Sequence, residues 1–168
     1  MKTLILMRHA KSDWKDPELS DHDRPLNARG RRSAPLIGEQ LASHDRIPEF
    51  ILASSAARVQ ETVALLRDTF RDAAGDPPEV QTESSLYLAS ASEILSHISV
   101  LHDAWNQVLV CGHNPGMNGL ACHFAQDSFD FPTAATLVLR TPSISWKDAL
   151  REDEWTLEHF WKPRELEA

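Results

Sequence analysis

The stretch Leu4-Ile5-Leu6-Met7-Arg8-His9-Ala10 begins with four consecutive apolar residues and then turns abruptly polar. A short apolar run that ends in polar residues is typical of a strand buried on both faces, as in a parallel sheet covered by helices. We therefore predict a central strand over about residues 1–8, with Arg8 and His9 at its carboxyl end.

Similar patterns continue outward from this strand. Short apolar or alternating runs predict five more strands, over about 50–53, 80–82, 108–111, 136–140 and 155–161. Helical spacing and capping residues predict four helices, over about 27–44, 56–70, 92–102 and 116–125. Pro35 is expected to kink or split the first helix, and residues 10–26 are expected to form a long loop. This order predicts a single α/β domain over residues 1–168, a three-layer sandwich whose mostly parallel central sheet carries helices on both faces.

The overall charge limits the class of partner. The formal net charge of −8 would repel a polyanion over most of the surface, so we expect no nucleic-acid partner. A few convergent arginines can still form a positive pocket within an acidic surface. Phosphorylated substrates therefore stay compatible with the composition.

The cysteine content and the N-terminus bear on localisation. Cys111 and Cys122 are the only cysteines, show no C-x-x-C spacing, and are expected to lie in the core. The apolar run 4–7 is well short of the ~7–15 residues of a signal-peptide core, and no segment approaches the ~18 apolar residues of a membrane span. We expect a cytoplasmic protein that does not enter a membrane.

Two predicted strands far apart in the chain both end in a histidine, in Arg8-His9 and in Gly112-His113. Ligands of open α/β sheets bind at the carboxyl ends of the strands. If these two strands are neighbours, both histidines face one crevice together with Arg58, which follows the strand 50–53. Guanidinium groups match phosphate oxygens, and imidazole can act as a nucleophile or a donor, so this set suits a tetrahedral dianion.

The same residues carry a family resemblance. Met7-Arg8-His9-Ala10 resembles the Arg-His-Gly signature of the histidine phosphatase superfamily, also called phosphoglycerate mutase-like. Ser54-Ser55-Ala56-Ala57-Arg58-Val59-Gln60-Glu61-Thr62 resembles its second-arginine segment, and Gly112-His113-Asn114-Pro115-Gly116 its third. The three segments occur in family order. Ala10 departs from the usual glycine and requires an ordinary backbone conformation there.

A further segment narrows the resemblance. Asp21-His22-Asp23-Arg24-Pro25-Leu26-Asn27-Ala28-Arg29-Gly30, together with the small size, is most similar to phosphohistidine phosphatases of the SixA type, which act in signal transduction. The resemblance implies a phosphatase without metal or cofactor. In it, His9 takes the phosphoryl group, water releases phosphate, and the phosphate is bound by Arg8, Arg24, Arg58 and His113.

Protonation states follow from these roles. To attack, His9 must be neutral with one ring nitrogen free, and a backbone carbonyl accepting the opposite N–H would fix the tautomer. His113 works best as a protonated donor, which nearby arginines oppose and a bound phosphate dianion favours. The eight histidines show neither H-E-x-x-H nor paired Cys/His spacing, so no metal site is predicted.

The proton donor to the leaving group is open between Glu83, just ahead of Leu86-Tyr87, and Asp21. A phosphohistidine substrate would relax this requirement, because imidazole leaves more readily than an alkoxide and can carry its own proton.

Four functions stay open at this point. The preferred one is removal of phosphate from phosphohistidine on a protein. A phosphatase acting on small phosphate esters is an alternative, as is a catalytically silent phosphate-binding or protein-interaction module. A mutase is disfavoured, since a chain this short leaves little room for insertions that enclose a phosphoglycerate. A monomer is expected.

Overall fold

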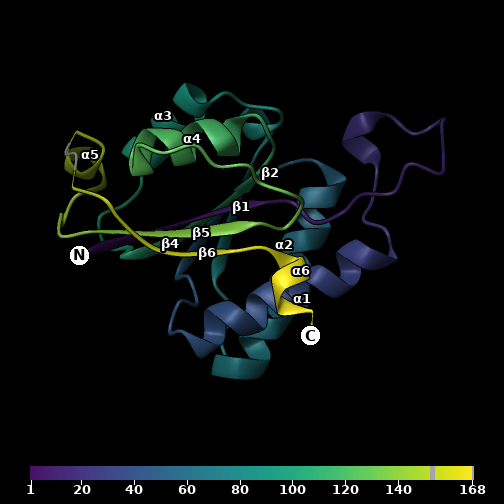
Figure 1. The fold of residues 1–168 in the computed structure, drawn as a ribbon, viewed down its shortest axis with the longest axis horizontal. Coiled ribbons are helices and arrows are strands. Elements are labelled where there is room, and N and C mark those ends of the chain that lie inside the picture. The colour runs from purple at the N-terminus through teal and green to yellow at the C-terminus, as the bar shows by residue number, and fades with distance from the viewer. Residues whose placement is uncertain (152–153, 168) are drawn as a thin grey trace.

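The computed structural model describes residues 1–151 and 154–167. Six strands form one sheet in the order β3-β2-β4-β1-β5-β6 (Figure 1). Their bounds are Lys2–Arg8 (β1), Phe50–Ser54 (β2), Glu79–Glu83 (β3), Gln107–Gly112 (β4), Thr136–Thr141 (β5) and Thr156–Trp161 (β6). The β3-β2, β2-β4 and β4-β1 pairs are parallel, whereas β1-β5 and β5-β6 are antiparallel. The predicted α/β class with a mostly parallel sheet is therefore confirmed.

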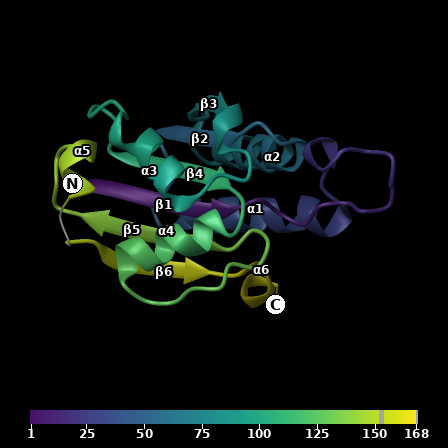
Figure 2. The ribbon, with the colours of Figure 1, turned by 90° about the horizontal axis from the view of Figure 1, so that it is seen from above.

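Helices cover both faces of this sheet. Their bounds are Ala28–Ser43 (α1), Ala57–Ala74 (α2), Ala91–Ser99 (α3), Gly116–Ala125 (α4), Trp146–Ala149 (α5) and Pro163–Leu166 (α6). Helices α1 and α2 lie on one face, and α3 and α4 lie on the other (Figures 1 and 2). Two short 3-10 turns are η1 (Asp21–Asp23) and η2 (Ser84–Leu86).

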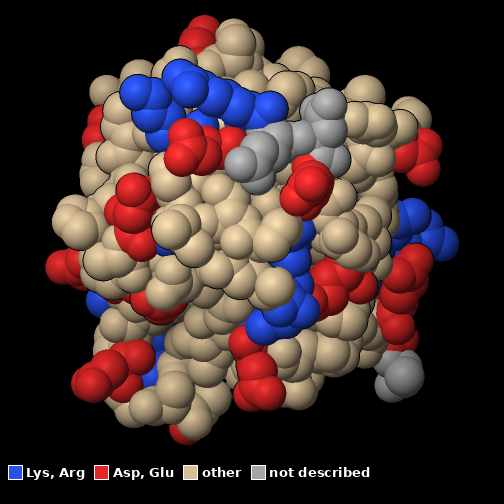
Figure 3. All heavy atoms as spheres, turned by 90° about the vertical axis from the view of Figure 1, so that its left-hand side faces the viewer, with Lys and Arg blue, Asp and Glu red and all other residues tan. Residues whose placement is uncertain are grey.

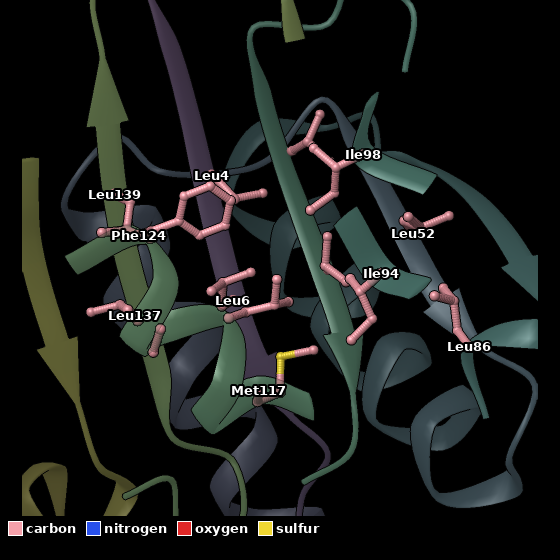
Figure 4. Close-up of a cluster of buried hydrophobic side chains, with 14 of the residues drawn as sticks. Leu4, Leu6, Leu52, Leu86, Ile94, Ile98, Met117, Phe124, Leu137 and Leu139 are labelled. Atoms are coloured by element: carbon pink, nitrogen blue, oxygen red, sulfur yellow. The ribbon is translucent and has the colours of Figure 1, made fainter. Parts of the chain in front are cut away.

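The alternation of side chains along β1 divides the core into two layers. Leu4 and Leu6 point to the side of α3 and α4, where they pack with residues such as Met117 (Figure 4). Ile5 and Met7 point to the opposite side, against α1 and α2. All four β1 side chains are fully buried. Burial on both faces explains why this strand is continuously apolar, and it makes β1 a rigid support for the residues that follow it.

Element bounds differ from expectation in a few places. The side chain of Asn27 caps α1 by accepting a hydrogen bond from the backbone N–H of Gly30, as predicted. Pro35 lies inside one continuous helix, so the helix is not split. Proline removes one N–H donor, but α1 packs against α2 and buries Ile37 and Leu41 beyond that point. Helix α3 ends at Ser99.

The two cysteines differ in environment. Cys111 is buried in β4, as expected. Cys122 is exposed on α4, so its expected place in the core is wrong. The side of α4 that faces the sheet is occupied by Met117, Leu120 and Ala121 instead.

Strands β1 and β4 are neighbours, with Arg8 paired in register with Gly112. Their carboxyl ends meet at one edge of the sheet, where the loop 10–26 extends (right side of Figure 1). The loop is closed at its base by a bridge between Ser12 and Leu26 and by the Asn27 N–H, which donates to the Lys11 carbonyl. At the opposite end, where β1 begins, basic and acidic side chains are interspersed (Figure 3).

Candidate active site

His9 follows β1 directly and is 6% exposed. Its Nδ1 lies 2.7 Å from the Ala10 carbonyl oxygen, and its backbone N–H donates to the Gly112 carbonyl at 3.0 Å. Burial and then the positive charge of Arg58 lower the pKa of His9 to about 3, although the Ala10 hydrogen bond acts in the opposite direction. His9 is therefore neutral, with Nδ1–H donating to Ala10 as expected and with Nε2 unprotonated.

Arg58 stands in the first turn of α2 and is almost fully buried. Its Nε donates toward Nε2 of His9 at 3.3 Å, and its Nη1 donates to the Asp21 carbonyl at 2.7 Å. Its Nη2 lies 3.0 Å from Oδ2 of Asp21 and 3.3 Å from Nδ1 of His113. One guanidinium group thus joins both histidines to the loop 10–26.

His113 follows β4 and is 2% exposed. Its ring centroid lies 5.3 Å from that of His9, and its Nε2 lies 2.8 Å from Oγ of Ser54. Burial and then Arg58 lower the pKa of His113 to about 4, whereas Asp21 acts in the opposite direction. At neutral pH this ring is uncharged, so the protonated donor expected from the sequence requires an added negative charge at the site.

Of the arginines that line the cavity, Arg8 makes the fewest hydrogen bonds to the described part of the chain. Its Nη1 donates to the Phe131 carbonyl at 2.9 Å. Its Nε is buried and has no hydrogen-bond partner among the described residues. Burial lowers the pKa of Arg8, with Asp130 acting in the opposite direction. A buried N–H without a partner is costly, and an anion in the adjoining cavity would satisfy it.

Arg24 is buried beside Arg58 but is largely committed to protein partners. Its Nη2 donates to Oδ1 of Asp21 at 2.8 Å, and its Nη1 donates to Oγ of Ser12 at 2.9 Å. Its guanidinium carbon also lies 3.3 Å from the centroid of the Trp14 ring. Arg24 therefore contributes positive charge to the site, while most of its hydrogen bonds fix the loop.

Asp21 does not have the environment of a proton donor. Its carboxylate accepts hydrogen bonds from the Tyr87 hydroxyl, Arg24 and Arg58. The Tyr87 hydrogen bond, followed by those of the two arginines, holds the pKa of Asp21 far below its usual range. Asp21 is thus a permanent carboxylate that orients two guanidinium groups.

Glu83 does not line the cavity beside His9. It ends the edge strand β3, where its Oε1 accepts a hydrogen bond from the Gln81 side chain at 2.6 Å. Of the two candidate acids, one is therefore outside the cavity and the other is ionised, and neither prediction fits this arrangement.

The cavity at the carboxyl ends of β1 and β4 measures about 330 Å³. It is lined by Arg8, His9, Lys11, Ser12, Trp14, Asp21, Arg24, Arg58, Leu88, His113, Asn114 and Thr133. Among residues 1–151 and 154–167, no group of three or more His, Cys, Asp or Glu side chains could hold a metal ion. The available chemistry is that of guanidinium and imidazole groups around a phosphate-sized space.

Sequence reasoning missed several supporting residues. Tyr87, the single tyrosine of the chain, binds Asp21 from the segment after η2. The hydroxyl of Thr62 accepts the Ala10 N–H at 3.1 Å and donates to the Arg58 carbonyl at 2.7 Å. Thr62 is the last residue of the segment 54–62 and lies one turn of α2 after Arg58. This spacing could have identified it. Nothing in the local sequence signals the contact of Tyr87.

A buried neutral histidine, three guanidinium groups and a second histidine at the carboxyl ends of parallel strands define a site for phosphoryl groups. The family model of the histidine phosphatase superfamily (branch 1) matches residues 4–86. The chain belongs to this superfamily, and the membership supports phosphatase activity.

Curated relatives extend over most of the chain. An uncharacterised chloroplastic protein of Arabidopsis thaliana is 31% identical over 153 residues, which cover 88% of this chain and 70% of the relative. An uncharacterised protein of Mycobacterium tuberculosis strain H37Rv is 33% identical over 153 residues, which cover 84% of this chain and 90% of the relative. Both relatives are uncharacterised, so they leave the substrate open.

Solved structures with the same fold include proteins assigned as phosphohistidine phosphatase SixA. One from Nakamurella multipartitia has a TM-score of 0.81 and 27% identity, with 96% of each chain covered. Another from Agrobacterium tumefaciens has a TM-score of 0.80 and 27% identity, with 96% of this chain and 98% of the other covered. The chain is therefore SixA-like within the superfamily, and the predicted phosphoglycerate mutase-like fold is confirmed.

Proposed function

We propose that this protein is a metal-independent phosphohistidine phosphatase that acts on a phosphorylated histidine-containing protein through a phospho-His9 intermediate. One observation carries the proposal. The neutral His9 ring has its Nδ1–H fixed by the Ala10 carbonyl and its Nε2 electron pair 3.3 Å from the Nε of Arg58. A histidine in this state can act as a nucleophile without a further base.

In the first step, Nε2 of His9 attacks phosphorus in line with the leaving group. A P–N bond to His9 forms while the P–N bond of the substrate breaks, and its electron pair passes to the departing imidazole nitrogen. If the substrate ring carries a proton on its other nitrogen, it departs as neutral imidazole. The Ala10 carbonyl stabilises the positive charge that develops on the His9 ring.

Positive groups of the chain stabilise the transferring phosphoryl group. Arg8 offers its unpartnered Nε, and Arg58 offers donors beside both histidines. Such groups act by position and charge, which is the main requirement of phosphoryl transfer. His113 becomes a donor when the dianion binds, because the added negative charge raises its pKa from about 4. Arg24 supplies further charge and holds Asp21.

In the second step, water attacks phosphorus on the side vacated by the imidazole. An O–P bond forms, the P–N bond to His9 breaks, and its electron pair returns to Nε2. The water proton leaves with the inorganic phosphate or passes to solvent. His9 is then neutral again and its Nδ1–H is still held by Ala10, so the site is restored without a cofactor.

The lack of a suitable acid at the two expected positions favours a phosphohistidine substrate. Glu83 lies outside the cavity lining and Asp21 is held ionised by Arg24 and Arg58. An alkoxide leaving group needs a proton at the transition state, whereas a protonated imidazole brings its own. An ester substrate therefore needs a proton from the protein, and neither Glu83 nor Asp21 is placed to donate it.

Two alternative functions are compatible with this site. A small-molecule phosphomonoesterase of the same superfamily would use the same arginines, and the cavity of about 330 Å³ could admit part of such an ester. A non-catalytic phosphate-binding or protein-interaction module would also use them.

Turnover of matched substrates distinguishes these functions. We expect a phosphorylated histidine carrier domain to be dephosphorylated much faster than simple phosphate esters. Esters turned over faster by orders of magnitude would contradict the phosphohistidine assignment. The Glu83→Gln variant serves as a control, and it should not change turnover of either substrate.

The cellular setting completes the proposal. We infer a cytoplasmic monomer with a role in signal transduction and with no membrane partner. The net charge of −8 supports the absence of a nucleic-acid partner. Within the described part of the chain, no helix has the length and apolar character needed to cross a membrane.

A further inference from the structure

Trp14 stands on the loop 10–26 with 70% of its surface exposed, and it lines the cavity beside His9. One face of its indole is covered by the guanidinium group of Arg24, whose central carbon lies 3.3 Å from the ring centroid. Arg24 is itself fixed by Asp21 and Ser12. The indole is therefore held in place from one side, while its large exposure leaves the rest of the ring accessible.

A second bulky apolar residue lines the same cavity. Leu88 is 53% exposed and has a φ of 52°, in the left-handed region that a leucine rarely adopts. The remaining lining side chains are mostly charged or polar, so a ligand that needed only phosphate contacts would gain nothing from these two. Their placement indicates that an apolar or aromatic part of the ligand lies near the phosphoryl group.

We propose that Trp14 is a specificity-determining residue whose accessible indole face receives the leaving group of the substrate and favours a planar imidazolium over small or aliphatic groups. This inference rests on the phosphatase function proposed above. It adds to that function a residue that recognises the leaving group instead of the phosphate.

The direction of the reaction supports this assignment. In phosphoryl transfer the attacking and leaving atoms lie roughly in line. Because His9 is buried behind the phosphoryl position, the leaving group must project from the phosphorus toward the mouth of the cavity. Trp14 lines the same cavity and is 70% exposed, which places it at the rim, toward which the leaving group projects. A leaving group bound there is separated from His9 by the phosphoryl group.

The chemistry of the ring supports it too. A phosphohistidine that supplies its own leaving proton carries a positive charge on its imidazole ring. Indole is the best aromatic partner for a cation, and it also stacks with planar rings. Trp14 would thus bind the protonated ring more tightly than the neutral ring, and so would favour the form that departs without an acid.

Two small substrates isolate this contact. Phosphoimidazole and phosphoramidate share the P–N bond, but only phosphoimidazole has an aromatic leaving group. For Trp14→Leu we expect the ratio of kcat/KM for phosphoimidazole to that for phosphoramidate to fall about three- to tenfold. Trp14→Phe should retain most of the ratio, because an aromatic face is kept. Leu19→Ala, on the same loop but outside the cavity lining, should leave the ratio unchanged.

An equal loss on both substrates in Trp14→Leu would overturn the proposal, because it would mean that Trp14 acts only by supporting Arg24. The ratio of the Kd values for phosphoimidazole and phosphoramidate, measured in a His9→Ala background with and without Trp14→Leu, provides a readout that needs no turnover. If the parent protein hydrolyses neither compound nor a phosphorylated histidine carrier domain, the phosphatase function fails, and the Kd ratio still decides the role of Trp14. If the parent hydrolyses both and the ratio does not respond to Trp14→Leu, only the role of Trp14 fails.

Discussion

The Nε of Arg58 lies 3.3 Å from Nε2 of His9, while Nη2 of the same guanidinium group lies 3.3 Å from Nδ1 of His113. Arg58 is thus the group that both imidazole rings share. Its positive charge contributes to the lowered pKa values of both rings. For His113 only burial lowers the pKa more, and for His9 the charge of Arg58 acts together with burial and other positive groups. Both histidines are therefore neutral before a negative charge enters the site, and His113 is the one that we expect to gain a proton when it does.

Replacing Arg58 with lysine should lower kcat/KM by about 10²–10³-fold, since one transition-state donor is typically worth that much. A single ammonium cannot reproduce the bonds that the planar guanidinium makes to His9, Asp21 and His113 together. The measurement is steady-state turnover of a phosphohistidine substrate. Arg71→Gln, at the exposed end of the same helix, is the matched control and should retain full activity. An Arg58→Lys variant as active as Arg71→Gln would contradict the assigned role.

Asp21→Asn should separate binding from turnover. Removing a negative charge beside Arg24 and Arg58 should tighten binding of a phosphate-like anion about three- to tenfold. The two guanidinium groups would be less well oriented, so kcat should fall about tenfold. Sulfate affinity and kcat for the same protein test both parts. Asp23→Asn, an exposed neighbour in η1, should change neither, and a loss of sulfate affinity in Asp21→Asn would rule out this electrostatic account.

Anion binding should be linked to proton uptake by His113. Its pKa is about 4 before binding, so the ring is almost entirely neutral at pH 6, and a bound dianion raises that pKa. Sulfate, which stays a dianion in this range, should therefore bind more tightly as the pH falls. The expected gain is about tenfold per pH unit between the raised pKa and about 4.

Titration calorimetry in buffers of different ionisation enthalpy measures this uptake. Proton uptake on sulfate binding is expected for the parent protein at a pH between the unliganded pKa of about 4 and the raised pKa. His113→Gln should bind sulfate without proton uptake, because glutamine does not titrate. His9, whose pKa is about 3, should contribute little in this range. Unchanged proton uptake in His113→Gln would assign the proton to another group.

Part of this account follows from the sequence because it depends on strand ends. His9 and His113 follow apolar runs, and the parallel β1-β4 pair brings such ends together. Arg58 was identifiable in the same way, as the first turn after β2. These positions are determined by local pattern and by the general geometry of α/β sheets.

Other parts depend on contacts between distant segments. Glu83 was a reasonable acid by type and order, but it ends the edge strand β3 outside the cavity lining. Asp21 was predicted as a site residue, but its role as a hydrogen-bond acceptor was not. The hydrogen bonds that it accepts from Tyr87, Arg24 and Arg58 exist only once the loop 10–26 folds over α2. Apolar periodicity carries no information on such contacts.

The loop 10–26 itself should depend on Gly30. A Cβ added to Gly30 would lie 2.2 Å from the backbone oxygen of Lys11, which cannot move without opening the base of the loop. Gly30→Ala should therefore lower the free energy of unfolding by about 1–3 kcal/mol and reduce activity. Denaturant unfolding measures the first effect. Gly119→Ala, which meets only the Ala91 side chain at 3.2 Å, should change stability by less than about 1 kcal/mol.

Covalent capture of the phosphoryl group tests the central claim most directly. Brief incubation with a labelled phosphohistidine donor, followed by acid and alkali treatment, should reveal an acid-labile and alkali-stable phosphoprotein. The label should map to His9 and vanish in His9→Ala, while His113→Ala still accepts some label because its ring is not the nucleophile. A label that persists in His9→Ala, or no label with any donor that the protein dephosphorylates, would contradict the account.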